Sequence, residues 1–353
     1  MARVKFENED PPAPVLERRY RVTLPLINFA DRPLHGYNDV DPGSGYLGRV
    51  DLGRNAVLVK LDEIESSRLS RELLQEEYDG YWPIDHRLEI LDVPTAEIYQ
   101  EATLLLRQFM LVVRAPVPVV RAVVDYKVGG THYRGGYIAL DTSTRNHHGF
   151  PRSRIETLKA LRVGMGSNLP QAVLRSLDHY DHSVRSLWRS DLDDAFVMAA
   201  VGFESLLGHK LDSEISYRLC LRATRLCRGG KDLFKALRTL YSLRSKIVHG
   251  GKSATGENVT HLQQALMRLI PSVAALSQEC GSYDEAMATL DALALGSGQA
   301  EPRTISSSGW WSYVPIEACL NWPATEAGVE DGWGADVRLY DYGPPYGGVS
   351  EEH

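Results

Sequence analysis

Two kinds of hydrophobic pattern divide the chain. Up to about residue 140, short runs rich in β-branched and aromatic residues alternate with Gly, Pro, Asn and Asp. Such runs predict β-strands, here over 21–29, 56–62, 119–128 and 135–140. One longer apolar stretch, over 95–115, predicts a helix that ends before Pro116. We therefore expect residues 1–150 to form a β-rich α+β domain.

From residue 169 onward, apolar residues recur at helical spacing instead. Six helices are predicted, over 169–188, 193–210, 213–227, 231–248, 258–279 and 283–295. The second is apolar almost all round, which predicts that it is the central helix. Short links between helices are typical of a helical bundle, which we place at 165–295. The glycines and proline of 141–167 indicate a connector.

The last part of the chain, 300–353, has a third character. It holds four of the six tryptophans, among Pro, Gly and acidic residues. Aromatic side chains at this density usually pack against something, so we expect an irregular, partly docked extension. The predicted fold class is therefore α+β, with an N-terminal mixed β-rich domain, an α-helical bundle and an aromatic-rich C-terminal extension.

Composition excludes several classes of protein. The 353 residues are 43% hydrophobic and 24% charged, which excludes wholesale disorder and a small disulfide scaffold. Two arginines and two prolines interrupt the most apolar stretch, 104–120, and the first ten residues lack the apolar core of a secretion signal. The four cysteines have no metal-like spacing and indicate reduced thiols. We expect a cytoplasmic protein without a membrane partner.

Charge changes this picture, because the net charge of −7 hides a strong local imbalance. Residues 214–252, hereafter the cationic segment, hold ten Lys and Arg against two acids, a net charge of +8. Residues 301–353 carry −7. The cationic segment is either a solvated helical face or a surface for RNA. The opposed charges also suggest that 301–353 restrains the cationic segment within the same chain, although a tail packed on the N-terminal domain is the alternative.

Candidate chemistry lies at the end of the cationic segment. Arg244 and His249 stand five residues apart, immediately before the helix-stopping Gly250-Gly251. Histidine can accept or donate a proton near neutral pH, and the arginine fork suits the charge that develops on a phosphate under attack. About one such Arg-His spacing is expected by chance. A second pair, Arg175 and His182, has similar spacing, so spacing alone does not choose between them.

Sequence context favours the first pair. The stretches VGFESLLG (201–208), SEISYRLCLRATRLC (213–227) and LYSLRSKIVHGG (240–251) occur in order with short spacers. Together they resemble the Apea-like branch of the HEPN superfamily. The resemblance implies a metal-independent endoribonuclease without a cofactor, built as a homodimer in which Arg244 and His249 are catalytic. By family analogy it also implies a role in bacterial defence, with 1–150 as a sensor or regulatory domain.

Further residues are assigned around this pair. We expect Glu204, in an otherwise apolar helix, to need a cationic partner and to orient Arg244. Tyr241, Ser245 and Lys246 are candidate substrate contacts; many HEPN proteins have Asn, Asp or His where Ser245 stands. The expected RNA-binding cations are Arg218, Arg222, Arg225 and Lys252. The alternatives are a non-catalytic HEPN module that binds RNA or a protein, helices that merely dimerise, and an Arg-His pair that closes the bundle.

Overall fold

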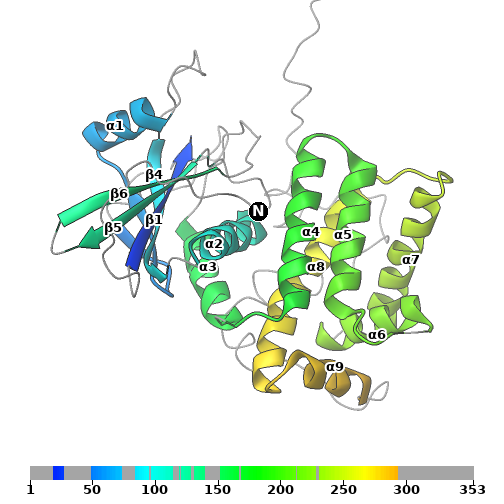
Figure 1. The fold of residues 1–353 in the computed structure, drawn as a ribbon. Coiled ribbons are helices and arrows are strands. Elements are labelled where there is room, and N and C mark those ends of the chain that lie inside the picture. Colours follow the sequence, from blue (N-terminus) through cyan, green and yellow to red (C-terminus); the bar gives the residue numbers. More distant parts are fainter. Residues whose placement is uncertain are drawn as a thin grey trace, which may run out of the picture.

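The computed structural model describes residues 19–27, 49–73, 84–94, 97–113, 119, 121–128, 131–139, 152–166, 168–211, 213–227 and 230–292. These residues form one antiparallel sheet and nine helices, which confirms the predicted mixture of α and β structure (Figure 1). The aromatic-rich extension 300–353, and with it the predicted restraint by 301–353, lies outside the described residues. None of the described helices is long and apolar enough to cross a membrane.

The sheet has six strands in the order β2-β3-β4-β1-β5-β6, and all neighbouring strands are antiparallel. The strands are β1 (Arg19–Ile27), β2 (Arg49–Asp51), β3 (Ala56–Lys60), β4 (Ile84–Pro94), β5 (Arg121–Val128) and β6 (Thr131–Ala139). Strands β1, β3 and β5 confirm the predictions over 21–29, 56–62 and 119–128. Strand β6 begins four residues before the predicted 135–140, and β2 and β4 were not predicted.

Strand β4 lies in the middle of the sheet although it carries the charged residues Arg87 and Glu89 on one of its two faces. Leu88 and Ile90 point to the buried face, where helix α2 (Ile98–Val113) packs on β1 and β4. On the opposite face Arg87 donates to Glu89 at 2.8 Å and also pairs with Glu65 of helix α1 (Glu63–Leu73). The two helices therefore lie on opposite faces of the sheet, and α2 confirms the helix predicted over 95–115.

Helix α3 (Arg152–Met165) joins the sheet to the bundle. The connector predicted over 141–167 therefore contains a helix that was not predicted, while residues 141–151 lie outside the described residues. Its Arg162 is 2% exposed and donates to Gln108 of α2 at 2.7 Å. The same guanidinium reaches the carbonyl oxygens of Gly53 and Arg54, in the turn between β2 and β3. At the C-terminal end of α3, Gln278 donates to the Met165 carbonyl. Burial lowers the pKa of Arg162 to about 10, because removing the guanidinium from water disfavours its charged form. The oxygens of Gln108, Gly53 and Arg54 offset part of that cost by accepting its hydrogen bonds.

The remaining helices form the predicted bundle: α4 (Gln171–Trp188), α5 (Leu192–Leu207), α6 (Ile215–Leu226), α7 (Lys231–Val248), α8 (Gly256–Glu279) and α9 (Tyr283–Ala292). All six predicted helices are present within a few residues of the expected bounds. The most deeply buried is α8, in which every residue from 262 to 277 is buried. Helix α5, predicted to be central, packs against α4, α6, α7 and α8. One side of it nevertheless stays partly exposed at Val197, Met198 and Val201.

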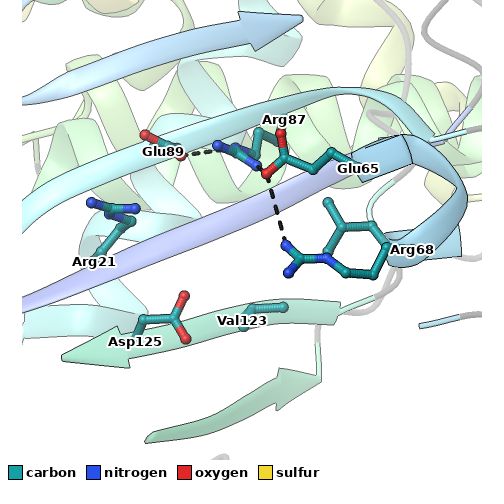
Figure 2. A pocket seen from close by; sticks show the side chains of 8 residues that line it. Arg21, Glu65, Arg68, Arg87, Glu89, Val123 and Asp125 are labelled. Carbon is teal, nitrogen blue, oxygen red and sulfur yellow. Dashed lines mark hydrogen bonds and ion pairs between the residues drawn. The ribbon is translucent and has the colours of Figure 1, made fainter. Parts of the chain in front are cut away.

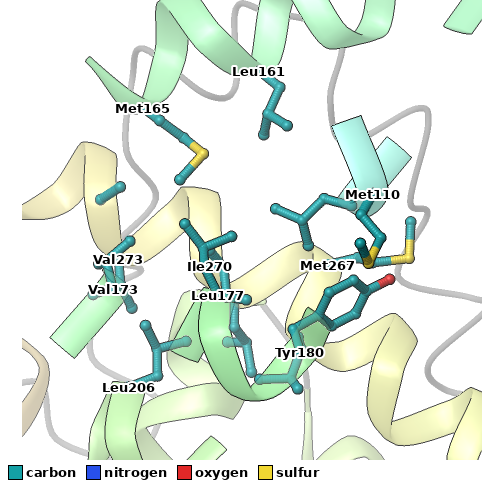
Figure 3. Packing of buried hydrophobic residues seen from close by; sticks show 14 of the residues in the cluster. Met110, Leu161, Met165, Val173, Leu177, Tyr180, Leu206, Met267, Ile270 and Val273 are labelled. Carbon is teal, nitrogen blue, oxygen red and sulfur yellow. The ribbon is translucent and has the colours of Figure 1, made fainter. Parts of the chain in front are cut away.

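The bundle core is continuous with the core beneath the sheet. Figure 3 shows side chains from α2, α3, α4, α5 and α8 gathered around Leu177 and Ile270, with Tyr180 beside Met110 and Met267. Helices α4 and α5 approach closely at Gly202, where a Cβ atom would lie 3.3 Å from the Cβ of His179. This packing holds α5 in place, and α5 in turn carries Glu204.

Candidate active site

The candidate site lies between α5 and α7. Glu204 stands in the last turn of α5, and its Oε1 lies 3.2 Å from Nε of Arg244. The same oxygen accepts a hydrogen bond of 2.5 Å from the hydroxyl of Tyr241, one turn earlier on α7. Asp193, at the start of α5, accepts a bond of 2.6 Å from the backbone N–H of Ala254, beyond the end of α7. The two helices therefore run antiparallel, with Glu204 beside the predicted site.

The carboxylate of Glu204 is half-buried, with 27% of its side chain exposed, and Arg244 is exposed to 35%. A carboxylate in this position needs partners because leaving water is costly for a charge. Burial, followed by the hydrogen bond to Glu204, raises the pKa of Tyr241, which keeps its hydroxyl protonated and available as a donor. The hydroxyl of Tyr241, predicted to contact substrate, is therefore engaged by Glu204.

A hydrogen-bonded C-cap fixes His249. The N–H of Gly250 donates to Ile247 and that of Gly251 donates to Lys246, both at 2.8 Å. Gly250 has φ of +71°, a left-handed conformation that glycine adopts without a Cβ penalty. This pair of bonds is the Schellman arrangement, in which the last helical carbonyls are satisfied by the two residues after the cap. The Gly-Gly sequence thereby sets the position of His249, the exposed C-cap residue of α7.

Arg244 and His249 do not face each other within one chain. Five residues of helix correspond to about 7.5 Å of rise and about 140° of rotation. Arg244 turns toward α5, whereas His249 is exposed on the outer side. Ser245 and Lys246 are also exposed, as is Lys252 after the helix. The structure thus brings Arg244, Glu204 and Tyr241 together and leaves His249 near the end of the same helix.

The predicted RNA-binding arginines of α6 have another role. Arg222 is 2% exposed, and its guanidinium binds Asp291 of α9 in a bidentate pair at 2.8 and 2.5 Å. It also donates to the carbonyl of His209, after the end of α5. The expectation that Arg222 contacts RNA is therefore wrong, because the side chain is inside the protein.

The neighbouring arginines of α6 bind the same helix. Arg218 pairs with Asp291 at 2.9 Å, and Arg225 donates to the carbonyl of Leu290. All three arginines therefore attach α9 to α6. The sequence signal that points to this role is their spacing of three and four residues, which places them on one side of a helix, opposite an acid near the end of the last predicted helix.

The alternative Arg-His pair does not form a site. Arg175 and His182 are both exposed on α4, and Nε2 of His182 lies 3.2 Å from the carboxylate of Asp194. Ser186 donates to that same carboxylate oxygen. In the described parts of the chain, no three His, Cys, Asp or Glu side chains are placed to hold a metal ion.

A hollow lies on the outer face of the sheet, beneath α1 (Figure 2). Its lining alternates in charge: Arg87 lies between Glu65 and Glu89, and Arg21 and Asp125 stand on the neighbouring strands β1 and β5. Glu89 is almost completely buried, with 3% of its side chain exposed. Three arginines and three acids line the hollow, so it has no net formal charge.

Comparisons with protein-family models, with curated proteins and with solved structures found no match for this chain.

The pairing of Glu204 with Arg244 can be measured by a double-mutant cycle. We expect Glu204→Gln and Arg244→Gln to show a coupling of about 0.5–1 kcal/mol in the free energy of unfolding, modest because both side chains are partly exposed. Urea denaturation of the four proteins measures it. The control cycle joins Glu204→Gln to Lys246→Gln, an exposed cation on α7, and should show no coupling. Equal coupling in both cycles would contradict the assignment.

The attachment of α9 by Arg222 predicts a pH-dependent stability. Asp291→Asn leaves a buried guanidinium without its counterion and should cost about 2 kcal/mol, less than a fully buried pair because Asp291 is a third exposed. The Arg222 hydrogen bond holds the pKa of Asp291 below its ordinary value. The advantage of the wild type is therefore present at neutral pH and disappears as the pH falls below about 4.

Urea denaturation at pH 7 and at pH 3 checks this expectation. The matched control is Asp284→Asn, which changes a carboxylate more exposed to solvent on the same helix. It should leave the free energy of unfolding nearly unchanged at neutral pH. A penalty for Asp291→Asn that is the same at both pH values would show that the ionised pair is not its cause.

Proposed function

We propose that the chain is a metal-independent endoribonuclease of HEPN type, active as a homodimer, with Arg244 and His249 as catalytic residues. One observation carries the proposal. The segment 240–251, which most resembles the family, is a helix whose capped end holds His249 in solvent while Glu204 fixes Arg244 one turn earlier. The HEPN assignment for 165–295 otherwise rests on the sequence resemblance.

The chemistry follows from what these side chains can do. The 2′-hydroxyl of RNA attacks the adjacent phosphorus, the new O2′–P bond forms and the P–O5′ bond breaks. An imidazole takes the proton from the 2′-hydroxyl, and an imidazolium returns one to the leaving O5′. The guanidinium of Arg244 stabilises the negative charge on the phosphorane oxygens. The products are a 2′,3′-cyclic phosphate and a 5′-hydroxyl, and no metal or cofactor takes part.

A homodimer accounts for the geometry of the site. One chain offers a single His249, whereas the reaction uses one proton acceptor and one proton donor, which two copies supply. The half-exposed apolar residues Val197, Met198 and Val201 lie on α5, and Val248, 57% exposed, lies on α7 one turn beyond Arg244. Because α5 and α7 are antiparallel, these side chains lie toward the same end of the helix pair. A second copy that covered them would bring two sites together.

A non-catalytic HEPN module that binds RNA or a protein is the second candidate. The observation that favours it is how Arg244 and His249 are placed within one chain. Arg244 is already paired with Glu204, and no hydrogen bond to the His249 imidazole is present in the described residues. In this alternative the cationic surface binds without cleaving, and binding weakens with salt while no product forms.

The N-terminal part, residues 1–150, is proposed as the sensor or regulatory domain of a defence or toxin-like ribonuclease. Two features support this. The hollow beneath α1 is lined by three arginines and three acids, whose side chains can form hydrogen bonds to a small polar ligand. Arg162 and Gln278 tie α3 both to the sheet and to α8. A change at the sheet would then reach the bundle through α3, independently of any restraint by 301–353.

Substitution of the two catalytic residues tests the proposal. Arg244→Ala and His249→Ala should each lower RNA cleavage by about 10²-fold or more, since one removes phosphorane stabilisation and the other removes proton transfer. Cleavage of total RNA in EDTA measures the rates, and sedimentation shows whether the dimer persists.

The matched controls are Arg175→Ala and His182→Ala, which remove the same residue types from α4. They should cleave like the wild type. Undiminished cleavage by either Arg244→Ala or His249→Ala would refute the catalytic assignment. Binding of RNA without any cleavage by the wild type would instead identify the non-catalytic module.

A further inference from the structure

The outer side of α7 carries an unbroken polar row. Lys231, Lys235, Arg238, Lys246 and His249 are all exposed. At about 100° of rotation per residue, their positions fall within about 60° of one line along the helix. Ser242 and Ser245, also exposed, fill the gap between Arg238 and Lys246. We call these seven residues the α7 row.

The cations of the row differ from the other arginines of the cationic segment. Arg218, Arg222 and Arg225 are bound to α9, and Arg244 is paired with Glu204. For Lys231, Lys235, Arg238 and Lys246, by contrast, no ion pair is found in the described parts of the chain; the nearest acid in sequence, Asp232, is exposed beside the row. Among the described residues, the row and the exposed Lys252 are therefore the parts of the cationic segment that are available to a partner.

The length of the α7 row indicates which kind of anion it can bind. Its cations extend over about 22 Å from Lys231 to Lys246, at about 1.5 Å per residue, and His249 follows about 4.5 Å further on. A small anion would engage one or two of these cations, whereas a linear chain of phosphates engages all of them. The row leads directly to the proposed catalytic histidine.

Aromatic side chains beside the row favour single-stranded RNA over duplex RNA as the partner. Phe234, about 60° to one side of the row, forms an edge-to-face pair with Tyr217 of α6, at 5.3 Å between ring centroids. Both rings are half-exposed. Unpaired bases stack on aromatic side chains next to a cationic track, whereas paired bases in an A-form helix are inaccessible to them.

We propose that single-stranded RNA lies along α7, with its phosphates on the cations of the α7 row and a base against Tyr217. The strand runs from Lys231 toward His249, so that the phosphate to be cleaved lies at the Gly-Gly end of the helix. The proposal deepens the proposed function and rests on it for the position of cleavage. The binding track itself is independent of catalysis.

The test measures binding of an uncleavable probe, a fluorescent single-stranded RNA with 2′-O-methyl groups, between 50 and about 300 mM salt. Each phosphate that the protein neutralises adds about 0.7 to the steepness of log K against log salt for a single strand. Lys231→Gln/Lys235→Gln/Arg238→Gln should therefore reduce the slope by about 2. The control Lys60→Gln/Arg175→Gln/Arg189→Gln removes the same charge from exposed positions elsewhere and should leave the slope unchanged.

A second variant tests the aromatic contact. Tyr217→Leu should weaken binding of the single strand by about fivefold or more while keeping the salt slope, because stacking releases no counterions. Three results would each overturn the proposal. The row variant and its control could reduce the salt slope equally, the wild type could fail to bind at 50 mM salt, or the matching duplex could bind more tightly than the single strand in a row-dependent way. Cleavage by the wild type together with any of these results would leave the proposed function intact. Row-dependent binding of the probe, together with no cleavage of unmodified RNA by the wild type, would refute the proposed ribonuclease activity but not the proposed binding track along α7.

Discussion

A charge that leaves water must find a partner, and this constraint governs how α5, α6, α7 and α9 are joined. The carboxylate of Glu204, half-buried between α5 and α7, accepts from Tyr241 and pairs with Arg244. The guanidinium of Arg222, buried beneath α9, pairs with Asp291. The cost of an unpaired buried charge exceeds most single contacts in a folded domain. These pairs therefore fix how the helices sit and hold the candidate site in one geometry.

The same constraint sorts the cations of a segment that looks uniform in sequence. The arginines of α6 bind α9, and Arg222 among them is buried, while the lysines and Arg238 of α7 stay in water. The positive charge that an RNA could contact is therefore smaller than the formal charge of +8 of the cationic segment. What remains is a narrower feature, a single helix edge that ends at His249. A cationic edge of this kind is compatible with an overall charge of −7 because binding depends on the local field.

The parts of the fold that depend on neighbouring residues in the sequence could be predicted from the sequence. Gly250-Gly251 marks the end of α7 because the left-handed cap favours glycine, and the six bundle helices follow from apolar spacing and short links. Strand β4 was missed because Arg87 and Glu89 interrupt its apolar residues, and only the strand pairing and α1 satisfy those charges. The role of Arg222 depends on Asp291, 69 residues away. Such a pairing is tertiary: the spacing of the α6 arginines places them on one side of a helix but does not identify their partner.

Cleavage of RNA through its own 2′-hydroxyl, by side chains alone, is the reaction proposed for this fold. The chemistry of the product ends tests it most directly. Wild-type protein incubated with total RNA in EDTA should yield fragments that end in a 2′,3′-cyclic phosphate and begin with a 5′-hydroxyl. Fragments that end in a 3′-hydroxyl and begin with a 5′-phosphate, or cleavage that stops in EDTA, would contradict this mechanism.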